Sequence, residues 1–179
     1  MNEHATGGPR VASARQRGAL ALSADRTAVQ AVSTLVRLGL AAVFLAAGAL
    51  KVVDPQSSVQ AVSAYALLPA GLETVVGWGL PFVEMALGLL LAAGLVTRVT
   101  ALASAALLLV FLAGVASAAA RGLSIDCGCF GGGGAIAPGQ TRYPAEMLRD
   151  LGLLALAGWL TWRPRSLFSL DPVEVGAER

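Results

Sequence analysis

The sequence contains two cysteines, and both lie in one five-residue segment, Cys127-Gly128-Cys129-Phe130-Gly131. Two cysteines separated by one residue can close a disulfide only as a tight, strained ring, and Gly128 supplies the backbone freedom that closure needs. Strained, exposed disulfides have high reduction potentials and exchange readily with thiols. The spacing therefore predicts a reactive thiol–disulfide couple, with Cys127 and Cys129 as its catalytic residues.

Two other interpretations of the cysteines stay open, an inert or loop-shaping pair and a metal site. Zinc usually takes four ligands, and the one histidine of the chain, His4, lies far from the pair in the N-terminal tail. A metal site would need Asp126 or a partner protein, so we expect no metal. The charge of Asp126 opposes thiolate formation, and Arg121 and Arg142 are the candidate cations that would counter it.

The composition predicts an integral membrane protein. Of the 179 residues, 56% are hydrophobic and 13% are charged, against about 25% charged in a typical soluble domain. So little charge cannot cover a soluble surface, and neither disordered, coiled-coil nor collagen-like chains have this composition. The net charge is only +2, with no basic helix interleaved with aromatic residues. We therefore expect a lipid bilayer and no nucleic acid as a partner.

Four apolar stretches are long enough to span a bilayer as helices, because its core of about 30 Å takes roughly 20 residues. They predict an all-α membrane protein, a four-transmembrane-helix bundle formed by one domain over residues 32–162. The expected helices are 32–50, 74–95, 99–120 and 145–162. Residues 1–31 are expected to form a disordered N-terminal tail, and residues 163–179 a C-terminal tail without structure of its own.

The distribution of basic residues predicts the orientation. The short connection 96–98 makes the second and third helices an antiparallel hairpin, so the longer connections 51–73 and 121–144 lie on one side of the membrane. Eight arginines lie on the side of the termini and three basic residues on the other. Both termini are therefore expected in the cytoplasm, with the Cys-Gly-Cys loop extracytoplasmic, where disulfides persist, in a multi-pass protein of the cell membrane. A cleaved signal peptide ending at residues 47–49 is the rival interpretation, and the long segment before it argues against it.

A few ionisable residues lie inside the expected helices. Glu84 should face the bundle interior, because a carboxylate in lipid is costly unless it is paired or protonated. Arg37 and Arg149 are its candidate partners, each within about 7 Å of its level along the helices. They would form either a polar cavity that binds a small solute or a quinone, or moves a proton to the thiols, or an ion pair that only fixes helix register. Lys51 is expected to extend to the membrane interface.

Several segments together resemble the MauE/DoxX family of small membrane proteins. They are the Cys-Gly-Cys-Phe-Gly motif and residues 37–51, 64–69, 80–88 and 149–151. The resemblance implies a redox-associated role: MauE-like proteins are linked to maturation of the disulfide-rich small subunit of methylamine dehydrogenase, relatives to thioredoxin-like proteins, and DoxX relatives to quinone-coupled sulfur oxidation. Four-helix disulfide–quinone oxidoreductases are analogous, but they use Cys-X-X-Cys, and this chain has a shorter spacing and no second pair.

Three functional hypotheses follow. In the first, the protein is a thiol–disulfide oxidoreductase or its accessory subunit, acting on an extracytoplasmic thioredoxin-like or disulfide-containing protein in the maturation of exported proteins. In the second, it is a non-catalytic membrane subunit or assembly scaffold. In the third, Arg37, Glu84 and Arg149 bind a small solute or a quinone.

Overall fold

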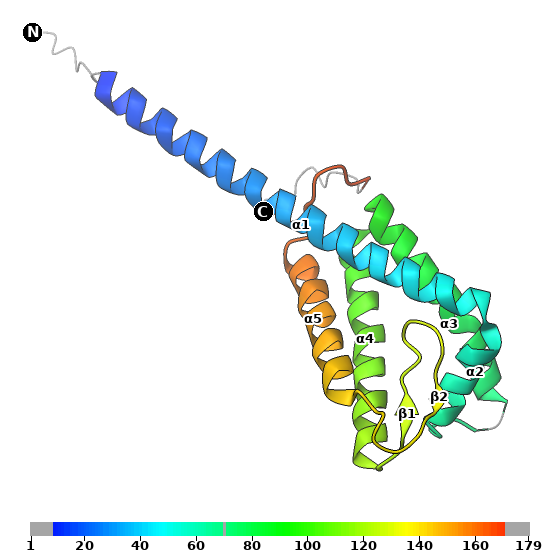
Figure 1. Ribbon diagram of the computed structural model, residues 1–179. Coiled ribbons are helices and arrows are strands. Elements are labelled where there is room, and N and C mark those ends of the chain that lie inside the picture. The colour runs from blue at the N-terminus through cyan, green and yellow to red at the C-terminus, as the bar shows by residue number, and fades with distance from the viewer. Residues whose placement is uncertain (1–8, 70, 171–179) are drawn as a thin grey trace, which may run out of the picture.

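The computed structural model describes residues 9–69 and 71–170, with side chains described from residue 25 onward. The chain is mostly helical, and one short two-stranded sheet interrupts the helices (Figure 1). In chain order the elements are α1 (Pro9–Val53), α2 (Pro55–Ala64), α3 (Leu72–Ala93), α4 (Thr97–Ala120), β1 (Ile125–Asp126), β2 (Gly134–Ala135) and α5 (Tyr143–Trp162). Helix α1 packs chiefly on α3 and α4 chiefly on α5, while α2 and the sheet lie together at one end of the molecule (Figure 1).

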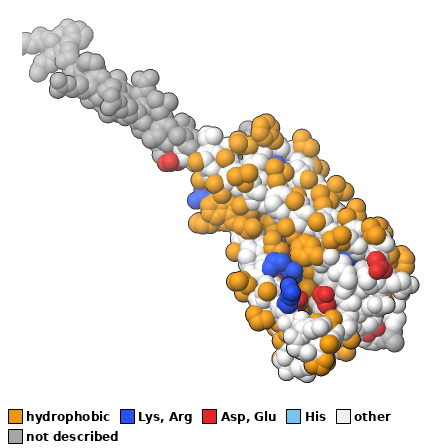
Figure 2. All heavy atoms as spheres, in the orientation of Figure 1, with side chains coloured by type: hydrophobic (Ala, Val, Ile, Leu, Met, Phe, Trp, Pro, Cys, Tyr) orange, Lys and Arg blue, Asp and Glu red, His pale blue; other side chains and the backbone are white. Residues whose placement is uncertain are grey.

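Three helices are long and apolar enough to cross a membrane: Asp25–Val53 within α1, Leu72–Ala93 and Thr97–Ala120. Hydrophobic side chains are spread over the visible face of the helical body (Figure 2). Large apolar residues stand open on that body, among them Leu35, which is 71% exposed, and Val110, which is 66% exposed. Apolar surface of this extent suits contact with lipid, so these features fit a multi-pass membrane protein.

Helix α1 is much longer than the sequence suggested. Residues 9–31, expected to be disordered, continue the same helix up to Pro9. The segment is rich in Ala, Leu, Arg and Gln, which are strong helix formers, and a proline suits the first position of a helix. Low hydrophobicity was therefore a poor guide to disorder here. The tail residues 1–8 and 171–179 lie outside the described residues.

Residues 163–170, expected to lack structure, are held against the helices by hydrogen bonds. Ser33 donates its hydroxyl to the carbonyl of Arg163 at 3.0 Å, and the backbone N–H of Leu167 donates to the hydroxyl of Thr34 at 2.8 Å. Ser169 donates to the carbonyl of Gly94 in the α3–α4 turn at 2.9 Å. This segment therefore lies at the end of the bundle that carries the α3–α4 turn.

The two long connections contain secondary structure of their own. Helix α2 occupies the first; the Asp54 carboxylate caps it by accepting from the Ser57 N–H at 3.1 Å, and a proline follows at its first position. The antiparallel strands β1 and β2 occupy the second, with Asp126 opposite Gly134. Helices α3, α4 and α5 begin and end within two residues of the expected bounds.

Helices α1 and α3 approach closely through glycines. A Cβ atom on Gly48 would lie 2.8 Å from the Pro81 carbonyl oxygen, and one on Gly88 would lie 3.0 Å from the Leu45 backbone nitrogen. Small residues permit such backbone contact where lipid supplies no hydrophobic drive between helices. Since Gly48 meets Pro81 and Gly88 meets Leu45, the two helices run antiparallel.

We expect Gly48→Ala to destabilise the protein by about 1–3 kcal/mol, because the new methyl group must push α1 and α3 apart. Gly39→Ala is the matched control on the same helix, since nothing lies within 4 Å of the atom it adds. Thermal unfolding of the purified variants in detergent measures both. Equal melting temperatures for the two variants would show that the glycine contact does not hold these helices together.

Candidate thiol redox site

Cys127 and Cys129 lie in the loop that joins β1 to β2, and this loop presses against α2. Gly128 has φ 66° and Gly133 has φ 109°, both in the left-handed region that side chains rarely adopt. A Cβ atom on either glycine would come within 2.5 Å of the Cβ of Ala61 on α2. Helix α2, which the sequence analysis did not anticipate, is therefore the surface against which the cysteine loop takes its shape.

Hydrogen bonds from three directions hold the loop backbone. Lys51 at the end of α1 donates to the Cys129 carbonyl at 2.9 Å. The N–H of Gly128 donates to the Asp126 carboxylate at 3.1 Å, and the Tyr65 hydroxyl donates to the Cys127 carbonyl at 3.4 Å. The thiols are thus carried on a fixed backbone, and both are free cysteines in this structure.

Glu84 pairs with Lys51 rather than with an arginine. The Lys51 Nζ lies 2.5 Å from Glu84 Oε1, and the two side chains are 3% and 1% exposed. The expectation that Lys51 extends to the interface was wrong, as was the choice of Arg37 or Arg149 as the partner of Glu84. The antiparallel register of α1 and α3 explains both, because it brings the end of α1 level with Glu84.

Arg37 lies at the other end of the bundle and belongs to no common site with Glu84. It donates to the carbonyls of Leu91 at 2.7 Å and Ala92 at 3.0 Å, in the last turn of α3. The last carbonyls of a helix have no intrahelical partner and carry the negative end of its dipole. Arg37 therefore closes the C-terminal end of α3, and its predicted place in a cofactor site has no support in this geometry.

Arg149 on α5 is the cation beside the thiols. Its Nη2 lies 3.8 Å from Cys127 Sγ and 3.0 Å from Asp150 Oδ1, and its guanidinium lies 5.0 Å from the centre of the Phe130 ring. The two cations expected from the sequence have other contacts: Arg121 donates to the carbonyls of residues 65 and 66, and Arg142 lines a polar cavity together with Asp126 and Glu146. The sequence could not reveal this, because 22 residues separate Cys127 from Arg149.

The pKa values of the two thiols are shifted in opposite directions. A hydrogen bond from the Cys129 thiol lowers the pKa of Cys127, and the bond from Arg149 lowers it further, against the effect of burial. The same thiol–thiol hydrogen bond, with burial and the nearby negative charge of Cys127 and Asp150, raises the pKa of Cys129. Cys127 is therefore the thiol that ionises first and the better placed nucleophile.

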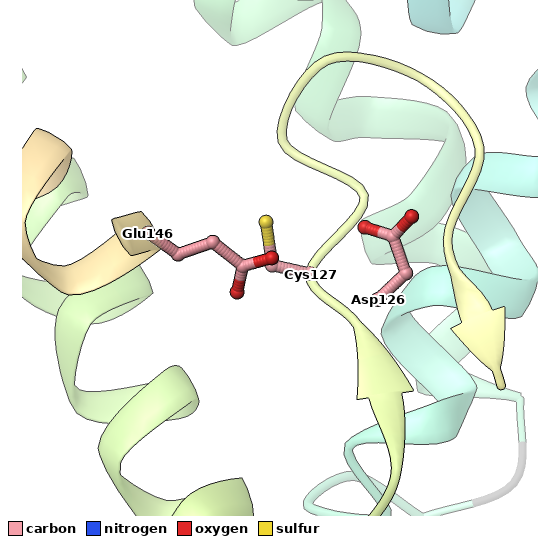
Figure 3. A group of neighbouring side chains, drawn as sticks. All are labelled: Asp126, Cys127 and Glu146. Carbon is pink, nitrogen blue, oxygen red and sulfur yellow. The ribbon is translucent and has the colours of Figure 1, made fainter. Parts of the chain in front are cut away.

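Two carboxylates flank the Cys127 thiol. Glu146 reaches toward it from α5, and Asp126 lies on the other side (Figure 3). One donor atom from each of the three residues lies within 4.8 Å of the other two. These are three donors against the four of a closed zinc site, so the prediction of no metal stays a prediction. The negative charge of Glu146 opposes the thiolate that Arg149 favours.

A small cavity lies between Cys129 and two of the predicted intramembrane residues, Glu84 and Arg149. Glu84, Cys129, Arg149 and Asp150 line it together with apolar side chains, and its volume is about 20 Å³. Of the five predicted site residues, the structure thus brings Cys127, Cys129, Glu84 and Arg149 into one region and leaves Arg37 out. The apolar lining consists of Val43, Phe44, Ala47, Leu108, Phe111, Phe130 and Leu153.

Comparisons with known proteins identify the family of this chain. The family described as "Methylamine utilisation protein MauE" matches residues 29–163, about three quarters of the chain. The chain belongs to the MauE family. The MauE part of the predicted resemblance is therefore confirmed. "Methylamine utilization protein MauE" of Paracoccus denitrificans is 36% identical over 126 residues, which cover 68% of this chain and 64% of that protein. No solved structure matches the chain.

Sequence reasoning missed Lys51, Asp150 and Glu146 as members of the site. The sequence did contain a signal for Lys51. A lysine at the end of one apolar helix comes close to the first half of the next helix when the two run antiparallel, and Glu84 lies near there on α3. Asp150 and Glu146 flank Arg149 in the first turns of α5, within the same charged cluster. Sequence reasoning could not predict that the connection between α4 and α5 folds back over these residues.

Alkylation with iodoacetamide should modify Cys127 at lower pH than Cys129. The thiolate is the reacting form, and a lowered pKa means that it is present at lower pH. Peptide mass spectrometry resolves the two cysteines as pH is raised. Arg149→Gln should move the Cys127 profile to higher pH, and Arg98→Gln, which changes an exposed arginine at the α3–α4 end of the bundle, should not. Identical profiles for the two cysteines would contradict the assigned asymmetry.

Proposed function

We propose that this protein carries out thiol–disulfide exchange through Cys127 and Cys129 in a loop outside the cytoplasm. The observation that carries the proposal is the Arg149 guanidinium 3.8 Å from the Cys127 sulfur, on a loop whose glycines allow two nearby cysteines to join. In one direction the Cys127 thiolate attacks a disulfide of the partner, forms a mixed disulfide and releases one partner thiolate. Cys129 then attacks Cys127 and releases the second partner thiolate, and the same steps in reverse oxidise two partner thiols.

The proposed topology has four membrane-spanning helices. Helix α5 joins the three apolar ones as the fourth, because its 20 residues rise about 30 Å, the thickness of the bilayer core. Its buried Asp150 is paired with Arg149, which reduces the cost of placing it there. The excess of arginines at the end of the α3–α4 turn supports cytoplasmic termini and an extracytoplasmic cysteine loop.

The proposed partner is a thioredoxin-like or disulfide-containing exported protein. Phe130 directly follows the cysteine pair and is 39% exposed, so it offers an apolar contact beside the reacting sulfur. The name of the Paracoccus relative supports a place in methylamine utilisation. The chain spans 64% of that relative's length, so this role is proposed for the shared membrane region.

A non-catalytic membrane subunit or assembly scaffold is the second candidate. The observation that favours it is the pair of carboxylates, Asp126 and Glu146, beside Cys127, because their charge opposes the thiolate that exchange requires. A bound quinone or small solute stays a prediction. The cavity at Glu84 and Arg149 has room for one water, whereas a cavity known to bind benzene measures about 150 Å³, so this one would have to open to admit a ring.

Replacement of one cysteine by serine should trap the partner. In Cys129→Ser the mixed disulfide at Cys127 cannot be resolved and should accumulate, whereas Cys127→Ser lacks the nucleophile and should trap at least several-fold less. Non-reducing gels of membranes from cells quenched with acid measure both. Failure of both variants to trap any protein, together with normal function of the double serine variant, would favour the scaffold.

Labelling of intact cells with a membrane-impermeant maleimide tests the topology. After mild reduction of the cells, Cys127 and Cys129 should react from outside. A cysteine introduced in place of Arg98, in the first turn of α4, should react only after lysis when the chain's own cysteines are replaced by serine. The opposite pattern would reverse the orientation.

A further inference from the structure

The cavity beside Cys129 is bordered by two buried carboxylates. Glu84 is 1% exposed and Asp150 is 2% exposed. Each uses one oxygen in an ion pair, Glu84 Oε1 with Lys51 and Asp150 Oδ1 with Arg149. The other oxygen of each, Glu84 Oε2 and Asp150 Oδ2, is buried without a hydrogen-bond partner among the described residues. A buried acceptor in that condition is costly, so each oxygen calls for a donor.

The size and lining of the cavity define what that donor is. Its volume of about 20 Å³ holds one water-sized molecule, and water is retained in a cavity only where two or more polar groups meet it. Here Glu84 and Asp150 approach from two different helices and Cys129 from the loop, and most of the remaining wall is apolar. The site therefore fits one water that can pass a proton between a thiol and a carboxylate.

We propose that this cavity is a proton site for Cys129, in which a water bound by the Glu84 and Asp150 carboxylates accepts the proton that Cys129 must lose before it can attack. This inference rests on the proposed exchange reaction, and it explains how Cys129 is deprotonated, a step for which the two cysteines alone provide no acceptor. Cys127 needs no such site, because Arg149 already favours its thiolate. The more buried setting of Cys129, beside Cys127 and Asp150, raises its pKa, so its ionisation requires an acceptor.

In the direction that closes the disulfide, each sulfur–sulfur bond that forms replaces one that breaks. The Cys127 thiolate attacks a disulfide of the partner, so one sulfur–sulfur bond breaks, a mixed disulfide forms and one partner thiolate leaves. The Cys129 proton moves through the water to a carboxylate, and the Cys129 thiolate then displaces the second partner sulfur from Cys127. Two electrons pass to the partner disulfide, whose two thiolates take one proton from the site and one from solution. Opening the disulfide runs the same steps in reverse.

The two halves of the reaction can be timed separately. The reduced full-length protein in detergent reacts with dithiobis(nitrobenzoate), an aromatic disulfide that releases one coloured thiolate when Cys127 attacks and a second when Cys129 closes the ring. Glu84→Gln and Asp150→Asn keep the size of each side chain and remove its capacity to take a proton. Each should slow the second release by about 100-fold at neutral pH, and should change the first release, which needs no proton acceptor, far less than the second.

Recovery at high pH separates a proton role from a structural one. Hydroxide replaces the carboxylate as acceptor, so the second release in both variants should approach the wild-type rate as pH is raised. Each variant is compared with itself at different pH values, so the same residues surround Cys129 throughout a measurement. The charged and titratable ones are Lys51 from α1, Tyr65 after α2, Glu84 from α3, Glu146, Arg149 and Asp150 from α5, and Cys127 in the loop. The apolar contacts from α4 carry no titratable group.

Glu73→Gln on α3 is the matched control, since Glu73 binds Ser63 and does not line the cavity. It should behave as the wild type in both releases. A normal second release in both cavity variants, or a slow one that high pH does not restore, would overturn the proton site while leaving the exchange reaction intact. Absence of the first release in the wild type would instead remove the proposed function itself. Melting temperatures show whether Glu84→Gln or Asp150→Asn has lost its fold. If one of them has, the second release of the other variant tests the proton site.

Discussion

The buried ion pair between Lys51 and Glu84 is the interaction on which the rest of the site depends. Two charges removed from water repay their desolvation only when the geometry is good and their remaining donors and acceptors are satisfied. Lys51 meets that demand by donating at once to Glu84 on α3 and to the Cys129 carbonyl in the loop. One ammonium group therefore joins α1, α3 and the cysteine loop. Removing one partner of such a pair costs about 3–5 kcal/mol, so the loop conformation is coupled to the packing of the helices.

Helix α1 carries two buried cations, Arg37 and Lys51, at well separated positions along its axis. Arg37 and Lys51 are 14 residues apart and so about 21 Å apart along the helix axis. Arg37 meets the carbonyls that end α3, where the helix dipole is negative, and Lys51 meets a carboxylate near the middle of the same helix. The glycines that bring α1 and α3 into backbone contact make both contacts possible. Antiparallel packing thus assigns one cation to closing a helix end and the other to holding the redox loop.

The apolar pattern predicted most of the helical framework and missed what positions the site. Hydropathy and small residues located α3, α4 and α5 to within two residues. A helix that spans a bilayer must be apolar along its own length, so each segment can be recognised from its own residues. The start of α1 was missed because helix propensity continues past the apolar stretch. The partner of Glu84 and the cation beside Cys127 were missed for a different reason. Both depend on the register between helices and on a long loop folding back, which no single segment encodes.

The two cysteines are equivalent in spacing and unlike in surroundings, and this difference gives the pair a preferred chemistry under the proposed function. Arg149 and the Cys129 thiol both stabilise a Cys127 thiolate, and this thiolate is present only in the reduced pair. Ring closure over a single glycine adds strain to the oxidised form. A redox pair whose reduced form is stabilised, or whose disulfide is strained, is the stronger oxidant. Under the proposed function both effects act in the same direction, and they favour taking electrons from the thiols of a partner over giving electrons to a partner disulfide.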